Sequence, residues 1–206
     1  MTTSPTEASR FWDDHHTSRR PAAEPPANVR LVEVVSALEP GRALDLGCGD
    51  GGDALWLARR GWRVTAADIS AVALARLAGR ARDLGLADRI TGERHDLAAT
   101  FPAGPFDLVS AHYLHTNFPL PRDHVLRRAA EALAPGGRLL VVEHGSVAPW
   151  SWNQDPDAHP AEPQVPSLDP AMWTVERADA LSRRATGPGG QTADVVDHLL
   201  LIHRTP

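Results

Sequence analysis

The chain of 206 residues contains no lysine, and all 21 of its basic residues are arginines. Without lysine there is no side chain to form a Schiff base, to hold pyridoxal as an aldimine or to complete a phosphate-binding loop. The single cysteine, Cys48, excludes an internal disulfide and a zinc site built from several cysteines. These absences remove several enzyme classes before any motif is considered.

Long apolar runs and an excess of positive charge are also missing. No apolar stretch approaches the roughly 20 residues of a membrane span, and the polar, acidic amino terminus does not resemble a secretion signal. The formal net charge of -5 gives no basic footprint for nucleic acid. We therefore expect no membrane or nucleic-acid partner, a cytoplasmic location, and a monomer or homodimer.

The pattern along the chain predicts an arm followed by one α/β domain. Residues 1–27 are polar and proline-rich apart from Phe11-Trp12, which predicts a partly disordered arm; residues 28–206 form the domain. Strands and helices then alternate, which indicates a doubly wound, mostly parallel sheet. Strands are expected at 43–46, 62–68, 90–95, 106–112 and 138–144, and helices at 28–38, 53–60, 70–84 and 121–133, with Asn28 and Ser70 as caps and a turn at 135–137.

The carboxyl-terminal part differs in composition. Residues 145–170 form a proline- and tryptophan-rich insertion, in which Trp150 and Trp152 are either a lid over an apolar acceptor or anchors for the loop. Residues 173–184 and 194–204 predict two strands around a glycine-rich turn, so the sheet should end in an antiparallel hairpin.

A glycine-rich turn follows the first expected strand. Gly47, Gly49 and Gly52 match the G-x-G-x-x-G fingerprint, and Asp68 ends the next strand, where an acid accepts ribose hydroxyls. On spacing alone the ligand could be a nicotinamide dinucleotide, whose pyrophosphate would sit at the helix start.

The acids around this turn favour a different ligand. Asp45, Asp50 and Asp53 would repel a pyrophosphate and attract a cation. S-adenosylmethionine carries a sulfonium and an ammonium group, has no phosphate, and keeps the adenosine that Asp68 would hold.

Five motifs then occur in order. Residues 43–51 read ALDLGCGDG, 64–70 VTAADIS, 95–97 HDL, 106–111 FDLVSA and 133–137 LAPGG. Over roughly the stretch from the first helix to the fifth strand, the chain resembles class I S-adenosylmethionine-dependent methyltransferases. Within this family it most resembles small stand-alone enzymes of the tellurite-resistance and thiopurine type. The resemblance implies a seven-stranded Rossmann-like sheet with a reversed last strand, and methyl transfer to a small-molecule acceptor.

The resemblance also assigns cofactor-binding roles. Gly47 and Gly49 would let the backbone approach the methionine part, since a Cβ would clash there. Asp45 would face the ammonium group, and Asp68 would accept both ribose hydroxyls. The remaining roles fall to residues around the adenine and beside the sulfonium: Ile69, Asp96 and Leu97, then Ala111 and His112.

Direct displacement of the methyl group needs a base only when the acceptor must lose a proton. Candidates near the carboxyl ends of strands are His112, His115, Tyr113 and His144, each of which is otherwise an ordinary pocket or surface residue. The spacing of His112 and His115 lacks an acid–histidine partner pattern, so no metal site is expected. Cys48 is read as a small residue tolerated between glycines rather than as a nucleophile.

Two other functions stay open. One is a protein that binds S-adenosylmethionine without methyl transfer, and the other is an NAD-type oxidoreductase, which the acidic turn disfavours. The chain departs from the family pattern in two places. SAHY at 110–113 replaces the NPPY of enzymes that methylate nucleobases or glutamine, and the tryptophan that often precedes the first helix is absent, with Trp12 as an untested substitute.

Overall fold

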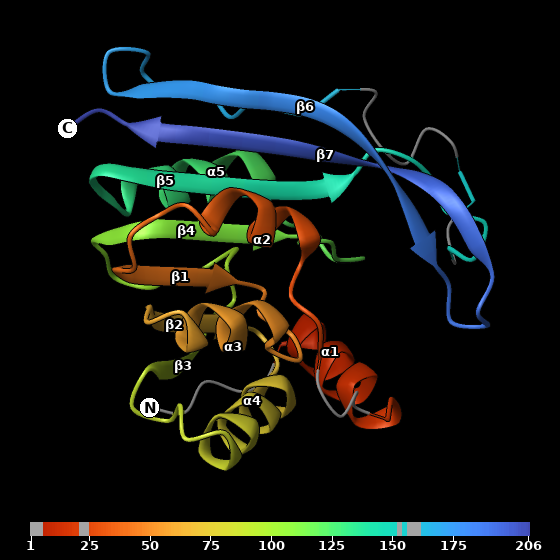
Figure 1. Ribbon diagram of the computed structural model, residues 1–206. Coiled ribbons are helices and arrows are strands. Elements are labelled where there is room, and N and C mark those ends of the chain that lie inside the picture. Colours follow the sequence, from red (N-terminus) through yellow and green to blue (C-terminus); the bar gives the residue numbers. More distant parts are fainter. Residues whose placement is uncertain (1–5, 21–24, 152–153, 156–161) are drawn as a thin grey trace.

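The computed structural model describes residues 6–20, 25–151, 154–155 and 162–206. Seven strands form one sheet in the order β3-β2-β1-β4-β5-β7-β6 (Figure 1). Strands β1 to β5 are parallel, whereas β7 runs antiparallel to both β5 and β6. The predicted doubly wound sheet with an antiparallel hairpin is confirmed. The elements are α1 (Glu7–Ser18), α2 (Val29–Val35), β1 (Arg42–Leu46), α3 (Gly52–Arg59), β2 (Arg63–Asp68), α4 (Ala71–Asp83), β3 (Ile90–Arg94), β4 (Phe106–His112), α5 (Arg122–Glu131), β5 (Leu133–His144), β6 (Trp173–Thr186) and β7 (Thr192–Arg204).

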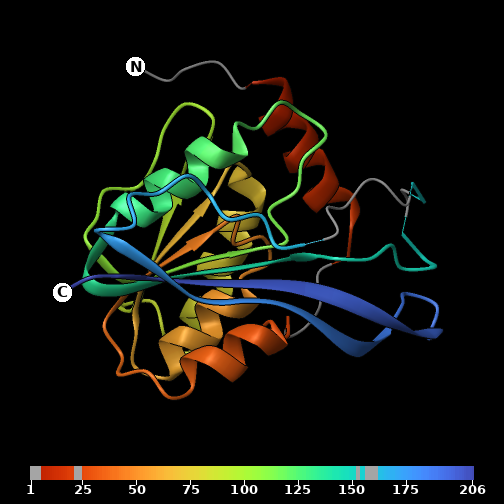
Figure 2. The ribbon, with the colours of Figure 1, turned by 90° about the horizontal axis from the view of Figure 1, so that it is seen from above.

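Helices cover both faces of the sheet. Helices α2, α3 and α4 pack on one face, in a core that includes Leu57 and Leu77, and α5 covers the other face with Leu126 (Figure 2). Successive strand residues such as Ala43 and Leu44 face these two cores alternately, as the pleat requires. Among the helices of the described ranges, none is long and apolar enough to span a bilayer.

The sequence signals for helix starts are confirmed, but one turn is not. The side chains of Asn28 and Ser70 cap α2 and α4 by accepting from backbone N–H groups two and three residues on, at 2.8 and 3.2 Å. Residues 135–137, predicted as a turn, belong to β5 instead. The pairing of β5 with β4 shifts register between Phe106 and Leu108, so the extra residues bulge out while the strand continues.

Residues 7–18 were predicted to belong to a partly disordered arm, but they form helix α1. The side chain of Thr6 caps this helix. Oδ1 of Asp13 accepts a hydrogen bond from Oγ of Ser70 at 2.7 Å and another from the N–H of Val72 at 3.2 Å, so α1 is tied to the start of α4. The sequence did not reveal the helix because its stabilising partners lie far along the chain.

The described residues of the insertion at 145–170 contain no helix or strand. Trp150 lies against the turn of the β6–β7 hairpin, where a Cβ on Gly187 would come within 2.5 Å of the Trp150 ring. Trp150 therefore packs against the hairpin, as the anchoring alternative requires. Trp152, its suggested partner in a lid, lies outside the described residues.

Candidate functional site

The carboxyl ends of β1 and β2 meet at the glycine-rich loop. Gly47 and Gly49 adopt φ angles of 67° and 49°, in the left-handed region that glycine enters without steric cost. The N–H groups of Gly49 and Ser70 donate to Oδ2 and Oδ1 of Asp68 at 2.9 and 2.8 Å. The loop therefore fixes the Asp68 carboxylate, and each oxygen keeps a lone pair for a further donor.

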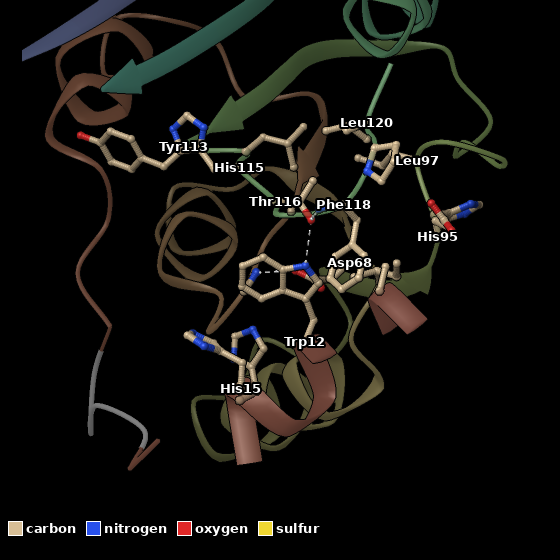
Figure 3. Close-up of a pocket in the computed structure, with 18 of the residues that line it drawn as sticks. Trp12, His15, Asp68, His95, Leu97, Tyr113, His115, Thr116, Phe118 and Leu120 are labelled. Atoms are coloured by element: carbon tan, nitrogen blue, oxygen red, sulfur yellow. Dashed lines mark hydrogen bonds between the residues drawn. The ribbon is translucent and has the colours of Figure 1, made fainter. Parts of the chain in front are cut away.

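A cavity of about 270 Å³ opens beside this loop (Figure 3). We call its two sides the strand-end half and the α1 half. The strand-end half consists of residues at the ends of β1 and β2 and just after β3: Gly47, Gly49, Asp68, Ile69, His95, Asp96 and Leu97. The α1 half consists of residues 8, 12, 15, 16 and 19 of α1 and its end, together with 113–116 and 118–120 of the segment after β4.

Six of the nine residues that the resemblance assigns to the cofactor line this cavity, and three do not. Ala111 is fully buried in the core beneath α5. His112 borders a second cavity of about 460 Å³, which shares Gly47 and Tyr113 with the first. Asp45 is only 2% exposed, behind the glycine loop.

Asp45 is a buried acid with one unsatisfied carboxylate oxygen. Its Oδ1 accepts a hydrogen bond from Oγ of Ser110 at 3.3 Å, whereas its Oδ2 is buried without a hydrogen-bond partner. Burial, reinforced by the nearby carboxylates of Asp53 and Asp68, raises the pKa of Asp45 well above its usual value. A cation near Oδ2 would lower this pKa again. The residue therefore fits the ammonium group that the resemblance places near it.

The other two acids of the turn are already engaged within the chain. Asp50 lies 3.8 Å from a guanidinium nitrogen of each of Arg76 and Arg80. Asp53 accepts from Nδ1 of His112 at 2.7 Å and from the N–H of Asn28 at 2.6 Å. The repulsion of a pyrophosphate is therefore weaker than the sequence implies, and the preference for a cation rests mainly on Asp45.

Comparison with known proteins agrees with this geometry. Residues 43–137 match the family model described as "Methyltransferase domain". The chain is 34% identical over 135 residues to a ubiquinone biosynthesis O-methyltransferase of Xylella fastidiosa, covering 65% of this chain and 54% of that protein. It is 33% identical over 134 residues to ribosomal RNA small subunit methyltransferase C of Alcanivorax borkumensis, covering 64% and 41%.

A solved structure extends the likeness in fold to almost the whole chain. TehB from Haemophilus influenzae matches with a TM-score of 0.66 over 95% of this chain and 67% of that chain, at 17% identity. The chain spans about half the length of the curated relatives it matches. Residues 43–137 are therefore assigned to a class I methyltransferase domain.

Two of the four predicted catalytic residues reach the first cavity, that of about 270 Å³. Tyr113 and His115 line it, whereas His112 and His144 do not. The Tyr113 ring stacks on His144 with centroids 4.2 Å apart, and His144 stacks on His115 at 5.4 Å. His115 is the exposed end of this stack, so it is the candidate that an acceptor in the cavity can meet.

Tyr113 is held by its hydroxyl group. The hydroxyl donates to Oδ1 of Asp197 at 2.9 Å and accepts from Nη2 of Arg183 at 3.1 Å. Burial and the nearby Asp197 raise the pKa of Tyr113 to about 12. The phenol therefore keeps its proton near neutral pH, and its ring lies at one end of the stack with His144 and His115.

Asp197 binds the hydroxyl of Tyr113, and the sequence analysis did not single it out. It is fully buried on β7 and also accepts from Nε of Arg183 at 2.7 Å and Nε of Arg30 at 3.3 Å. Two guanidinium groups and a phenol compensate its charge in the interior. The only signal in the sequence was an acid within the apolar run of residues 195–202.

The contribution of helix α1 to the cavity was also missed, apart from the question raised about Trp12. The indole Nε1 of Trp12 donates to Oγ1 of Thr116 at 3.4 Å, and Phe11 packs edge-on against Phe118 with centroids 5.5 Å apart. Trp12 thus lies at the cavity, although it precedes the first predicted helix by many residues (Figure 3).

The thiol of Cys48 is poorly suited to act as a nucleophile. Cys48 is 8% exposed, and burial raises the pKa of its thiol well above the usual value, so the reactive thiolate is disfavoured. Within the described ranges, no group of three or more histidine, cysteine or acidic side chains could hold a metal ion.

Proposed function

We propose that this protein transfers a methyl group from S-adenosylmethionine to a small-molecule acceptor. The observation that carries the proposal is one continuous cavity. Its strand-end half contains the residues assigned to adenosine and the glycine loop, and its α1 half continues from there to His115. Donor and acceptor would therefore lie next to each other in one cavity, which favours direct transfer.

The strand-end half would hold the donor through a few residues. Asp68 has lone pairs for the ribose hydroxyls, and Asp96 and Leu97 offer an acceptor and an apolar surface to the adenine. Gly47 would leave room for the methionine part, and the unsatisfied Oδ2 of Asp45 would attract its ammonium group. When bound, S-adenosylmethionine supplies a methyl group already activated by its positive sulfur.

The α1 half would place the acceptor and exclude water. Trp12, Phe118 and Leu120 give it an apolar wall. If the acceptor is a hydroxyl, His115 would take its proton, with Tyr113 and His144 stacked behind it to hold the ring.

A small acceptor is favoured over a large one. The ubiquinone biosynthesis relative is named as an O-methyltransferase, which supports a small molecule, while another relative is named for ribosomal RNA. The formal net charge of -5 does not favour RNA. A cytoplasmic location and a monomeric or homodimeric state are also proposals from the sequence.

Two measurements test the proposal. We expect calorimetry to show micromolar binding of S-adenosylhomocysteine and no binding of NAD; the reverse result would contradict the cofactor assignment. We then expect a methyl-labelled donor to mark a product in a metabolite extract. Binding without any labelled product would favour the alternative, a protein that binds the cofactor without methyl transfer.

A further inference from the structure

Charge is distributed unequally between the two halves of the cavity. The strand-end half carries the acids Asp68 and Asp96, whereas the lining residues of the α1 half include no aspartate or glutamate. Arg19, at the end of α1, brings a positive charge to that half. A cationic acceptor would find no acid among the residues that line this half.

Aromatic rings dominate the walls of the α1 half. Trp12 lines this half; its polar atom is engaged by Thr116, and its indole packs among the rings of Phe11, His15 and His16, with centroids 5.4, 5.2 and 6.5 Å away. The ring of Phe118 is held by its edge contact with Phe11. Aromatic rings fixed in this way offer flat surfaces on which another ring can stack.

His15 completes this wall as a neutral ring. Nη1 of Arg19 lies 3.1 Å from Nε2 of His15, and a guanidinium group can only donate, so Nε2 is the acceptor and Nδ1 carries the proton. Burial, together with the charge of Arg19, lowers the pKa of His15. Its ring therefore adds no positive charge near neutral pH but keeps one donor, at Nδ1.

Building on the proposed function, we infer that the acceptor is a flat aromatic molecule, neutral or anionic, that binds against the rings of Trp12 and Phe118. Helix α1 then selects the acceptor, although it lies outside the residues 43–137 that match the family model. The apolar walls select the ring system, and the lack of acids selects against amines.

Four probes of similar size distinguish the contribution of an aromatic ring from the contribution of charge. Calorimetry on the full chain saturated with S-adenosylhomocysteine would compare 2-naphthol, 2-naphthoate, 2-naphthylmethylammonium and the saturated alcohol decahydro-2-naphthol. We expect 2-naphthol or 2-naphthoate to bind about tenfold more tightly than the ammonium compound. We expect 2-naphthol to bind about fivefold more tightly than the saturated alcohol.

Substitutions in the α1 half then test whether 2-naphthol binds there. Trp12→Ala should weaken 2-naphthol binding about tenfold, and Trp12→Phe should restore most of it, because a ring is restored. Trp56→Ala is a matched control: this tryptophan lies on α3, where it contacts Arg60, and does not line the cavity. Trp56→Ala should leave the affinity for 2-naphthol unchanged.

The outcomes distinguish this inference from the proposed function. Binding of S-adenosylhomocysteine is measured first, and its absence would contradict the proposed function itself. If that binding is present, equal or tighter binding of the ammonium probe would overturn the acceptor inference alone. The same holds if both Trp12→Ala and Phe118→Ala leave the affinity for 2-naphthol unchanged.

Discussion

The two halves of the cavity are held in place by different kinds of interaction. In the strand-end half, the backbone N–H of Gly49 fixes Asp68, and both residues belong to adjacent parallel strands and their loops. In the α1 half, side chains from distant parts of the chain meet, as Trp12 does with Thr116 and Phe11 with Phe118.

This difference separates cofactor binding from acceptor choice. Backbone hydrogen bonds tolerate changes of neighbouring side chains, so the strand-end half depends mainly on its glycines and on Asp68. The α1 half depends on the identity of a few rings. Substitutions there should change the acceptor and leave the fold of the sheet intact.

Replacing Gly47 by valine should abolish cofactor binding. Its φ of 67° is unfavourable for a β-branched residue, and its Cβ would lie 2.7 Å from Cδ1 of Leu114, a residue of the cavity wall. Calorimetry with S-adenosylhomocysteine should detect no binding.

Gly79→Ala is the matched control for this change. Gly79 lies in α4, and its added Cβ would meet nothing within 4 Å, so we expect normal binding and about 0.5–1 kcal/mol of added stability. Near-normal affinity in Gly47→Val would mean that the loop can rearrange and would remove the backbone argument for this half.

Replacing Asp68 by alanine should weaken binding of S-adenosylhomocysteine roughly hundredfold, because hydrogen bonds from ribose to a charged acceptor are lost together with the anchor of Gly49. Asp83→Ala, at the exposed end of α4, controls for the loss of one acid. Equal affinity in both variants would place the ribose elsewhere.

Most of the strand-end half was predicted from the sequence, because its signals are local. Strand periodicity, the glycine spacing and an acid at the end of β2 are all read within about 30 residues of one another. Sequence reasoning failed where the geometry of side chains decides. It did not show that Ala111 is buried in the core or that Asp53 is paired with His112.

The α1 half was not predictable in the same way. Helix α1 has few apolar residues, and it is stabilised by contacts such as that of Asp13 with Ser70, 57 positions away. The hydrogen bond from Tyr113 to Asp197 joins the segment after β4 to β7, across 84 positions of the chain. Pairings of this kind have no periodic signal in a single sequence.

The burial of Tyr113 and its contact with Asp197 should be visible in the titration of the phenol. Tyr113 is the only tyrosine, so tyrosinate absorbance at high pH reports on this residue alone. We expect a pKa of about 12 in the folded protein, against about 10 in the unfolded chain. Because the folded pKa is the higher one, the stabilisation is fully present below pH 10 and is lost as pH rises towards 12, at a cost of roughly 2–3 kcal/mol.

Asp197→Asn tests the cause of this shift. Removing the negative charge beside the phenol should lower the pKa of Tyr113 towards its ordinary value, with far-UV circular dichroism at each pH to confirm that the protein is folded. An unchanged titration in the variant, or an ordinary pKa in the unmodified protein, would show that Asp197 does not hold the stack behind His115.

The smallest effect is expected from Asp13→Ala, which removes the cap that α1 provides to α4. The loss of the hydrogen bonds from Ser70 and Val72 should cost about 1 kcal/mol in the free energy of unfolding, measured with urea. Its exposed neighbour gives the control, Asp14→Ala, with little change expected. Since Asp13 fixes α1 and does not line the cavity, binding of 2-naphthol should weaken more than binding of S-adenosylhomocysteine. An equal loss of both would mean that α1 supports the two halves alike, and the separation between them would not hold.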